Sequence, residues 1–330
     1  MFVPQAWILV IGSYVAIAFA YLLPQDFQSD SRAYVAVALT AFMIRTFLFH
    51  LGLLVLLTTV VAASVRRWWL VAAAIPLLAM TVGQAGWSYV PREPPAAIGP
   101  TITVMSVNLL HANRETAGIL SEVAAARPDV LVLQEYTQHW HRAFQAALAD
   151  DYQHAAYVCR SDSFGLAVYS KVAFASPADV ELPIGGIGTP QARVVLDVAG
   201  GRVALYNIHL LPPKRLDWTI EQRQEFADLL ALLEREELPV ILCGDFNFTN
   251  ATAFAAELRR RGLRDAHELA GVGRGATWPV LKFFRYLPGI RLDHIYQSSE
   301  LTSTRSTTGT GRGSDHRPIV AEVGFARSSN

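Results

Sequence analysis

Two short segments combine carboxylate, amide and imidazole groups in a way that could support hydrolytic chemistry. Asp245 and Asn247 stand two residues apart after an apolar run, and Asp315 and His316 are neighbours. Side chains alternate along an extended segment, so we expect Asp245 and Asn247 to share one side. By the same rule, Asp315 and His316 need a turn, or different jobs, to serve one site. Whether these pairs belong to one functional site depends on which residues stand at the ends of the other predicted strands.

Polar side chains end most of the short apolar runs that follow the first hundred residues. A strand end is a rigid position from which a side chain projects into the crevice at the edge of a sheet. A single polar residue at such a position usually just meets solvent, but this explanation is poor for the whole set. The runs at 102–107, 130–133, 203–208, 240–243 and the one ending at Leu292 lead into Asn108, Glu135, His209, Asp245 and Asn247, and Asp293.

This inventory is typical of a site for a hard cation. Carboxylates with amide and imidazole groups, and no thiolate, suit Mg²⁺ or Mn²⁺. Hydrolysis of a phosphoester needs neutralised phosphoryl charge, an activated water and a stabilised leaving oxygen. We expect Glu135 to be a metal ligand, and the remaining carboxylates and imidazoles to do the other work: Asp245, Asp315, His209 and His316.

A second Asp-His neighbour pair, Asp293 and His294, raises the same problem of opposite directions. We expect Asp293 to hold the His316 imidazole across the site, which would fix its tautomer and raise its basicity. The competing interpretation is that the pair only caps a strand. We favour that structural role for His294 and not for Asp293.

Helical patterns separate the strands and predict an α+β fold. They cover residues 117–126, 139–148, 220–235 and 252–261, and a β-hairpin is expected over 192–209 around Gly200 and Gly201. A final strand is expected at 318–323. Strands mixed with helices indicate a layered sandwich.

Three apolar stretches at the start of the chain predict a transmembrane segment. They cover about residues 6–23, 46–65 and 68–90, and each approaches the 20 or so residues that cross a bilayer. Residues 33–44 are also apolar, and could extend the second helix or lie along the membrane interface. A cleaved signal peptide is disfavoured because no basic residue precedes the first stretch.

Arg66 and Arg67 lie in the short loop between the second and third stretches. Short basic loops stay in the cytoplasm, so we expect a multi-pass protein of the cell (inner) membrane with its later part on the outer or periplasmic side. Arg32 and Arg45 oppose this orientation.

The net charge and the two cysteines exclude few functional classes. The formal net charge is zero, which gives no support to a dedicated nucleic-acid binder. Cys159 and Cys243 lack the spacing of a zinc site, so free thiols are favoured, with a disulfide as the alternative.

Six motifs in order make residues 101–325 resemble the endonuclease/exonuclease/phosphatase superfamily. The most specific are Gly244-Asp245-Phe246-Asn247 and Gly313-Ser314-Asp315-His316-Arg317-Pro318. The resemblance implies a four-layered α/β/β/α sandwich and a metal-dependent phosphoester hydrolase. The other motifs are Ser106-Val107-Asn108, Leu133-Gln134-Glu135, Asn207-Ile208-His209-Leu210 and Arg291-Leu292-Asp293-His294-Ile295.

The same resemblance implies a role for each motif residue. Glu135 would bind the metal, with Asn108 beside it at metal and phosphate, and Asp315 would be a second carboxylate there. Asp245 would orient or deprotonate the water. The remaining roles concern the phosphate: Asn247 contacts it or the leaving oxygen, His209 binds it or acts as an acid, and His316, oriented by Asp293, hydrogen-bonds it.

The substrate stays open between phospholipid head groups and nucleic acid. Lys214 and Arg215 follow the His209 motif, and residues 278–286 mix aromatic with basic side chains, which suits a lipid interface or stacked bases. An exported nuclease is one alternative, and a non-catalytic membrane scaffold of the same fold is another. No protein partner is predicted.

We divide the chain into residues 1–91 with the transmembrane helices, a proline-rich linker at 92–100, the catalytic domain at 101–325 and a tail at 326–330.

Overall fold

A computed structural model describes residues 2–280 and 282–327, except for the side chains of Phe2, Lys282 and Arg285. Leu281 and the tail residues 328–330 lie outside it. The N-terminal part consists of six consecutive helical elements: α1 (Phe2–Leu22), α2 (Arg32–Thr46), α3 (Leu48–Ser64), α4 (Trp68–Leu78), η1 (Ala79–Gly83) and α5 (Gln84–Trp87).

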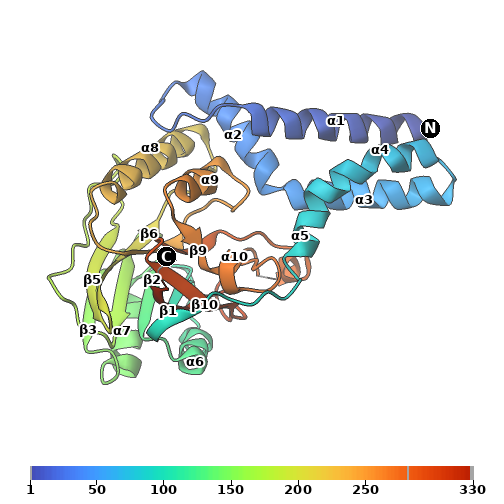
Figure 1. The fold of residues 1–330 in the computed structure, drawn as a ribbon. Helices are drawn as coiled ribbons and strands as arrows, with labels where there is room; N and C mark the ends of the chain where they lie inside the picture. The colour runs from blue at the N-terminus through green and yellow to red at the C-terminus, as the bar shows by residue number, and fades with distance from the viewer. Residues whose placement is uncertain (1, 281, 328–330) are drawn as a thin grey trace.

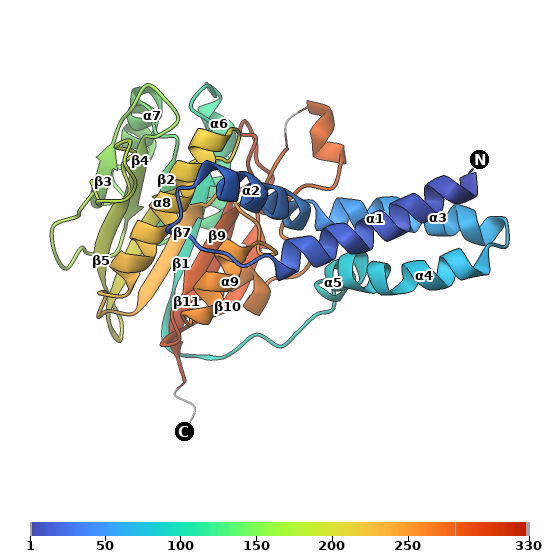
Figure 2. The same cartoon turned by 90° about the horizontal axis from the view of Figure 1, so that it is seen from above.

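Helices α1, α3 and α4 lie side by side and project away from the rest of the molecule (Figures 1 and 2). The N-terminus and the α3–α4 turn, which contains Arg66 and Arg67, both lie at the far end of this bundle. Apolar side chains such as Ile8, Leu57 and Trp69 are exposed along it. Such a surface suits lipid better than water.

Two helical stretches, Val3–Leu22 and Trp68–Trp87, are each long and apolar enough to cross a membrane. A third crossing is added if α2 and α3 are counted together, although they are bent by 58° at Phe47. The residues 33–44 that the sequence left open form α2, which leaves the direction of the bundle and packs on the other domain beside α8 (Leu216–Leu233).

Two mixed β-sheets form the centre of the second part of the chain. The six-stranded sheet has the order β10-β11-β1-β2-β4-β3 and the five-stranded sheet the order β5-β6-β7-β9-β8. The strands are β1 (Ala97–Asn108), β2 (Val130–Gln134), β3 (His154–Val158), β4 (Leu166–Ser170), β5 (Ala192–Val198), β6 (Gly201–His209), β7 (Val240–Asp245), β8 (Arg264–Asp265), β9 (Asp293–Gln297), β10 (Leu301–Thr308) and β11 (Ile319–Ala326).

Three apolar cores hold the layers together. Val132 of one sheet and Leu205 of the other pack between the sheets. Helices α6 (Thr116–Ala126) and α7 (Gln138–Leu148) cover the larger sheet, and α8 and α9 (Ala253–Arg260) cover the smaller one (Figure 1). Two short elements, α10 (Ala266–Ala270) and η2 (Lys282–Tyr286), complete the chain. The predicted α+β, four-layered α/β/β/α sandwich is therefore confirmed.

The predicted strands and helices recur within a few residues of their expected bounds, and the hairpin at 192–209 is present as β5 and β6. One strand end was placed wrongly. Asp293 begins β9 and does not follow a strand. Because β9 runs antiparallel to β7, its amino end lies at the same sheet edge as the carboxyl end of β7, so Asp293 still reaches that edge.

Aromatic packing fastens the N-terminal helices to the sandwich, in addition to the continuous chain. Phe27, in the α1–α2 loop, lies 4.8 Å from both Phe226 and Phe254, measured between ring centroids. Strand β1 begins at Ala97, inside the segment predicted as a linker. Cys159 and Cys243 are both free thiols, so the disulfide alternative is wrong.

Candidate active site

Three neighbouring strands of the smaller sheet bring a row of polar residues to one edge. In the strand register, Asp245 on β7 pairs with His209 on β6 and with Asp293 on β9. Residues that pair across strands point to the same face of a sheet. All three side chains are buried, so they face one another and not bulk solvent.

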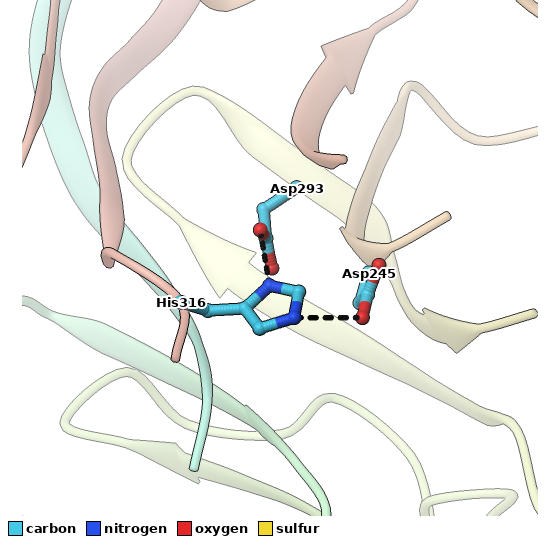
Figure 3. Close-up of side chains that lie close together, drawn as sticks. All are labelled: Asp245, Asp293 and His316. Carbon is cyan, nitrogen blue, oxygen red and sulfur yellow. Dashed lines mark hydrogen bonds and ion pairs between the residues drawn. The ribbon is translucent and has the colours of Figure 1, made fainter. Parts of the chain in front are cut away.

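His316 completes this row from the loop before β11. Its Nδ1 lies 2.8 Å from Asp293 Oδ2, and its Nε2 lies 3.8 Å from Asp245 Oδ2 (Figure 3). Thr277 Oγ1 accepts hydrogen bonds from the backbone N–H groups of Leu292 and Asp293, which holds the backbone at the start of β9. The structure thus joins Asp293 to His316 across the site, as the sequence predicted.

Burial and neighbouring charges have opposite effects on the pKa values of His316 and Asp245. Burial would lower the pKa of His316, but the carboxylates of Asp293 and Asp245 raise it to about 10. Burial raises the pKa of Asp245 above its usual range, although the two neighbouring imidazoles oppose the change. A proton is therefore held on the imidazole, and Asp245 is a stronger base than an exposed aspartate.

The larger sheet contributes Asn108 and Glu135, which adjoin the same edge. Asn108 Nδ2 donates to Glu135 Oε1 at 3.2 Å and to Asp245 Oδ2 at 3.0 Å, so one amide bridges the two sheets. His209 Nε2 lies 3.7 Å from the same Asp245 oxygen. Glu135 has a φ of 57°, a left-handed conformation that only a few per cent of non-glycine residues adopt and that often occurs at functional sites.

Glu135 is held ionised by its neighbours. Burial alone would raise its pKa, but electrostatic interaction with the His209 imidazole and hydrogen bonds from His111 and Asn108 hold the pKa below its usual range. His111 donates its backbone N–H to Glu135 Oε2 at 2.7 Å, and its Nδ1 lies 2.9 Å from the same atom.

The expectation that Asp245 and Asn247 share one side of an extended segment is wrong. Asn247 does not continue an extended segment after Asp245, because its φ is 52° and its backbone N–H donates to Asp245 Oδ1 at 3.0 Å. Its amide donates to Leu210 O at 2.8 Å. The chain therefore turns immediately after β7, and the two side chains meet the cleft through this turn and not through strand alternation.

Gly244 makes the approach of β6 and β7 possible. Its φ is 141°, and a Cβ at this position would lie 1.9 Å from Ile208 O. Only glycine avoids both the conformational strain and the clash. The glycine of this motif is thus a steric requirement of the strand pair that carries His209 and Asp245.

Asp315 lies at the rim of the row and not inside it. Its Oδ2 accepts a hydrogen bond from Trp278 Nε1 at 3.2 Å. The bend that separates it from His316 is fixed by Ser314, whose hydroxyl donates to Asn108 O and accepts from the His316 N–H. The turn that this Asp-His pair needs is therefore present.

His294 has a structural role, as the sequence favoured, but it lies within β9 and does not cap the strand. It is fully buried, with Nδ1 2.7 Å from Asp265 Oδ2 and Nε2 3.0 Å from Phe248 O. Both ring nitrogens are occupied inside the core, away from the cleft.

The contacts of several residues around the site were not predicted from the sequence. His111 follows Asn108 by three residues and could have been suspected from its place in the turn after β1. Gln134 Nε2 donates to Asn207 Oδ1 at 2.8 Å, and Asn207 Nδ2 donates to Leu133 O, so buried amides tie the two sheets beneath the row. Nothing in the sequence signals this bridge, because its partners are distant along the chain.

A cleft of about 390 Å³ opens above the row and includes Glu135, His209, Asp245, Asn247, Asp315 and His316 in its lining. Among the described residues, the histidine and carboxylate group with ligand atoms within 4.8 Å of one another is Asp245, Asp293 and His316. Within that group, His316 Nδ1 is hydrogen-bonded to Asp293. This contact favours a protonated imidazole over an imidazole that binds a metal ion. Glu135 and Asp315 add carboxylate oxygens to the same cleft, a donor set that fits a hard divalent cation.

Comparisons with known proteins agree with this geometry. The model of the endonuclease/exonuclease/phosphatase family matches residues 105–316, which is more than half of the chain. No curated protein matches the sequence.

Solved structures share the fold at low sequence identity. A 3′-5′ exonuclease (NExo) from Neisseria meningitidis has a TM-score of 0.56 and 21% identity, covering 68% of this chain and 100% of that one. TDP2 from D. rerio, complexed with a single-strand DNA product, has a TM-score of 0.55 and 20% identity, covering 68% and 99%. The catalytic domain of human Nocturnin, with a bound sulfate anion, has a TM-score of 0.53 and 19% identity, covering 70% and 97%.

The matched segment contains the complete row from Asn108 to His316, set at the edge of a four-layered sandwich. The chain therefore belongs to the endonuclease/exonuclease/phosphatase family.

Proposed function

We propose that this protein is a membrane-anchored, divalent-metal-dependent hydrolase of phosphodiesters that works by in-line attack of an activated water. The observation that carries the proposal is the environment of Asp245 Oδ2. One amide and two imidazole nitrogens surround this single buried oxygen, at 3.0, 3.7 and 3.8 Å. A basic oxygen at the floor of an open cleft is suited to take a proton from water.

Glu135, with Asn108 and Asp315, would hold Mg²⁺ or Mn²⁺. The ion would neutralise charge on the phosphoryl oxygens. The low pKa of Glu135 keeps a negative charge available at this position. His111 would orient the Glu135 carboxylate through its two contacts to Oε2.

The remaining residues act on water and phosphate. Asp245 orients the water and accepts its proton. His316, protonated and oriented by Asp293, donates to a phosphate oxygen and stabilises charge that develops there. His209, whose Nδ1 has no partner among the described residues, and Asn247 contact the phosphate or the leaving oxygen.

The membrane topology is part of the proposal. Helices α1, α3 and α4–α5 would cross the bilayer of the cell (inner) membrane, with the N-terminus and the Arg66–Arg67 turn on the cytoplasmic side. The sandwich, at the opposite end of the bundle, would lie on the outer or periplasmic side. We keep the division into residues 1–91, 92–100, 101–325 and 326–330.

A substrate panel tests the proposal. The full chain in detergent would be given a chromogenic phosphodiester, a phosphomonoester and nucleic acids, with Mg²⁺ or with a chelator. We expect Mg²⁺-dependent diester cleavage that falls by at least about a thousandfold in Asp245→Ala. Wild-type protein that binds no Mg²⁺ in calorimetry and cleaves nothing would contradict the proposal and favour a non-catalytic scaffold.

Nucleic acid is the second candidate substrate. One structural neighbour is an exonuclease and another is complexed with a single-strand DNA product, and Lys214 and Trp218 both line the cleft of this chain. A cation next to an aromatic ring can bind a backbone phosphate and a stacked base. Faster cleavage of single-stranded DNA than of any lipid or small diester would establish this candidate.

A further inference from the structure

One wall of the active-site cleft comes from outside the catalytic sandwich. Phe42, Met43, Thr46 and Phe47, from the end of α2 and the α2–α3 junction, line the cleft together with Asp245 and His316. Three of these four side chains are apolar. A phosphate bound in the cleft would therefore have an apolar surface directly beside it.

This wall is fixed to both parts of the molecule. Phe42 packs edge-to-face on Phe254 of α9 at 5.8 Å between ring centroids. Arg223 of α8 donates to Asp26 O in the α1–α2 loop. Arg45 Nε donates to Ala20 O of α1 at 2.8 Å. The position of α2 over the cleft is thus a property of the folded chain.

The cleft lies at the level where the bundle begins, because α3 starts at Leu48, one residue after Phe47. The helical stretch that contains α4 and α5 indicates the same position for the membrane surface. Trp68–Trp87 spans 20 residues, about 30 Å of helix and the thickness of a hydrocarbon core. Exposed aromatic residues mark its two ends, with Trp69 at the far end and Trp87 at the end near the sandwich.

An aromatic loop reaches the same level. Pro288 O lies 2.7 Å from His50 Nε2, which places the loop after η2 against the first turn of α3. Phe283 and Phe284 are 66% and 56% exposed. Two neighbouring exposed phenylalanines beside the start of a membrane helix are suited to enter the interface of a bilayer.

We propose that the substrate is a glycerophospholipid of the adjoining leaflet. Its phosphodiester enters the cleft from the side of the membrane, its acyl chains stay in the bilayer along α2, and Phe283 and Phe284 hold the cleft at the surface. This inference rests on the proposed function and adds the substrate class. Water attacks phosphorus, the P–O bond to one alcohol breaks, and that oxygen takes up a proton.

The experiment compares two rates in one preparation. The full chain, reconstituted in vesicles of phosphatidylcholine and phosphatidylglycerol, is assayed for release of phosphorylated or free head group and for cleavage of a soluble chromogenic diester. The readout is the ratio of the lipid rate to the soluble rate. Wild-type protein is expected to cleave both in the presence of Mg²⁺.

Two variants test the two surfaces separately. Phe283→Ser combined with Phe284→Ser removes the membrane contact, and Met43→Gln makes the wall polar. Each is expected to lower the ratio at least fivefold. Tyr157→Ser, on the edge strand β3, removes an exposed aromatic ring remote from the bundle and is expected to keep the wild-type ratio.

The outcomes separate the two proposals. If neither lipid nor soluble diester is cleaved, the proposed function fails. If the soluble diester is cleaved while the lipids are not, or if either test variant keeps the wild-type ratio, the lipid inference alone is overturned. Cleavage of single-stranded DNA at a higher rate than lipid would also overturn it.

Discussion

Two buried histidine–aspartate pairs lie close together in this protein and have nearly the same local geometry. His316 lies 2.8 Å from Asp293, and His294 lies 2.7 Å from Asp265. They differ in the second ring nitrogen. In His316 it faces Asp245 and the cleft, whereas in His294 it is bonded to Phe248 O.

The difference teaches that an Asp-His pair gains a chemical role from what its free nitrogen can reach. His316 lines the cleft, so its protonated ring can meet a substrate. Burial opposes ionisation of Asp265, but Arg291 and the hydrogen bond from His294 hold the pKa of Asp265 below its usual range, so Asp265 links Arg291 and His294 within the core.

The largest expected effect in this comparison comes from substitution of His316, to which we assign a catalytic role. His316→Ala should lower kcat/KM for a soluble diester by about three orders of magnitude or more, because a fixed charged donor to the phosphate is lost. In this variant, water from the cleft can fill the space of the missing imidazole and solvate the otherwise buried Asp293 carboxylate, so the melting temperature should change little. Steady-state kinetics and thermal unfolding in detergent measure both. A loss below tenfold would contradict the assigned role.

His294→Ala should have the opposite profile. It leaves the buried Asp265 Oδ2 without its hydrogen-bond donor, which costs about 2–4 kcal/mol of unfolding free energy. The activity of the protein that remains folded should stay within about threefold of wild type. Denaturant unfolding monitored beside activity per folded molecule checks this. An intact stability with a large loss of kcat would reverse our assignment of the two pairs.

Asp293→Asn tests whether orientation alone is enough. The amide keeps the size of the side chain but removes the negative charge that raises the pKa of His316. We expect kcat to fall by about 10–100-fold, with a pH–rate profile that loses activity at a lower pH than wild type. An unchanged profile would show that Asp293 does not act through the His316 charge.

A smaller effect, on the pH dependence of stability, is expected at Glu225, which belongs to neither pair. Burial raises its pKa to about 7, and its carboxylate accepts from Leu211 N and Thr189 Oγ1. Since the folded-state pKa exceeds the unfolded value near 4.5, stability is full at low pH and falls as pH rises from about 4.5 through about 7.

Glu225→Gln can keep both hydrogen bonds while staying neutral. It should therefore raise the unfolding free energy at pH 8 by about 1–2 kcal/mol and change it little at pH 5. Thermal unfolding at the two pH values measures the difference. Equal effects at both would mean that the carboxylate is not neutralised on folding.

Much of the site could be predicted because its residues stand at the ends of apolar runs, which the sequence displays directly. Asn108, Glu135, His209 and Asp245 all came from this one pattern. The geometry of Asn247 could not, since a left-handed residue after a strand leaves no signal when the residue is not glycine.

Contacts that join distant parts of the chain also escaped prediction. The pairing of His294 with Asp265 joins two strands whose order in the sheet is not written in the sequence. Residues 33–44 have the composition of a spanning helix and of a surface helix alike. Only the packing of α2 against α8 and α9 shows that it covers the cleft.

The central claim is that Asp245 is the base at a metal-dependent hydrolytic site. The kcat of the isosteric variant Asp245→Asn, measured with saturating Mg²⁺ on a soluble phosphodiester, tests it most directly. We predict a loss of at least about a thousandfold at an unchanged melting temperature. A variant that keeps more than a tenth of the wild-type kcat would contradict it.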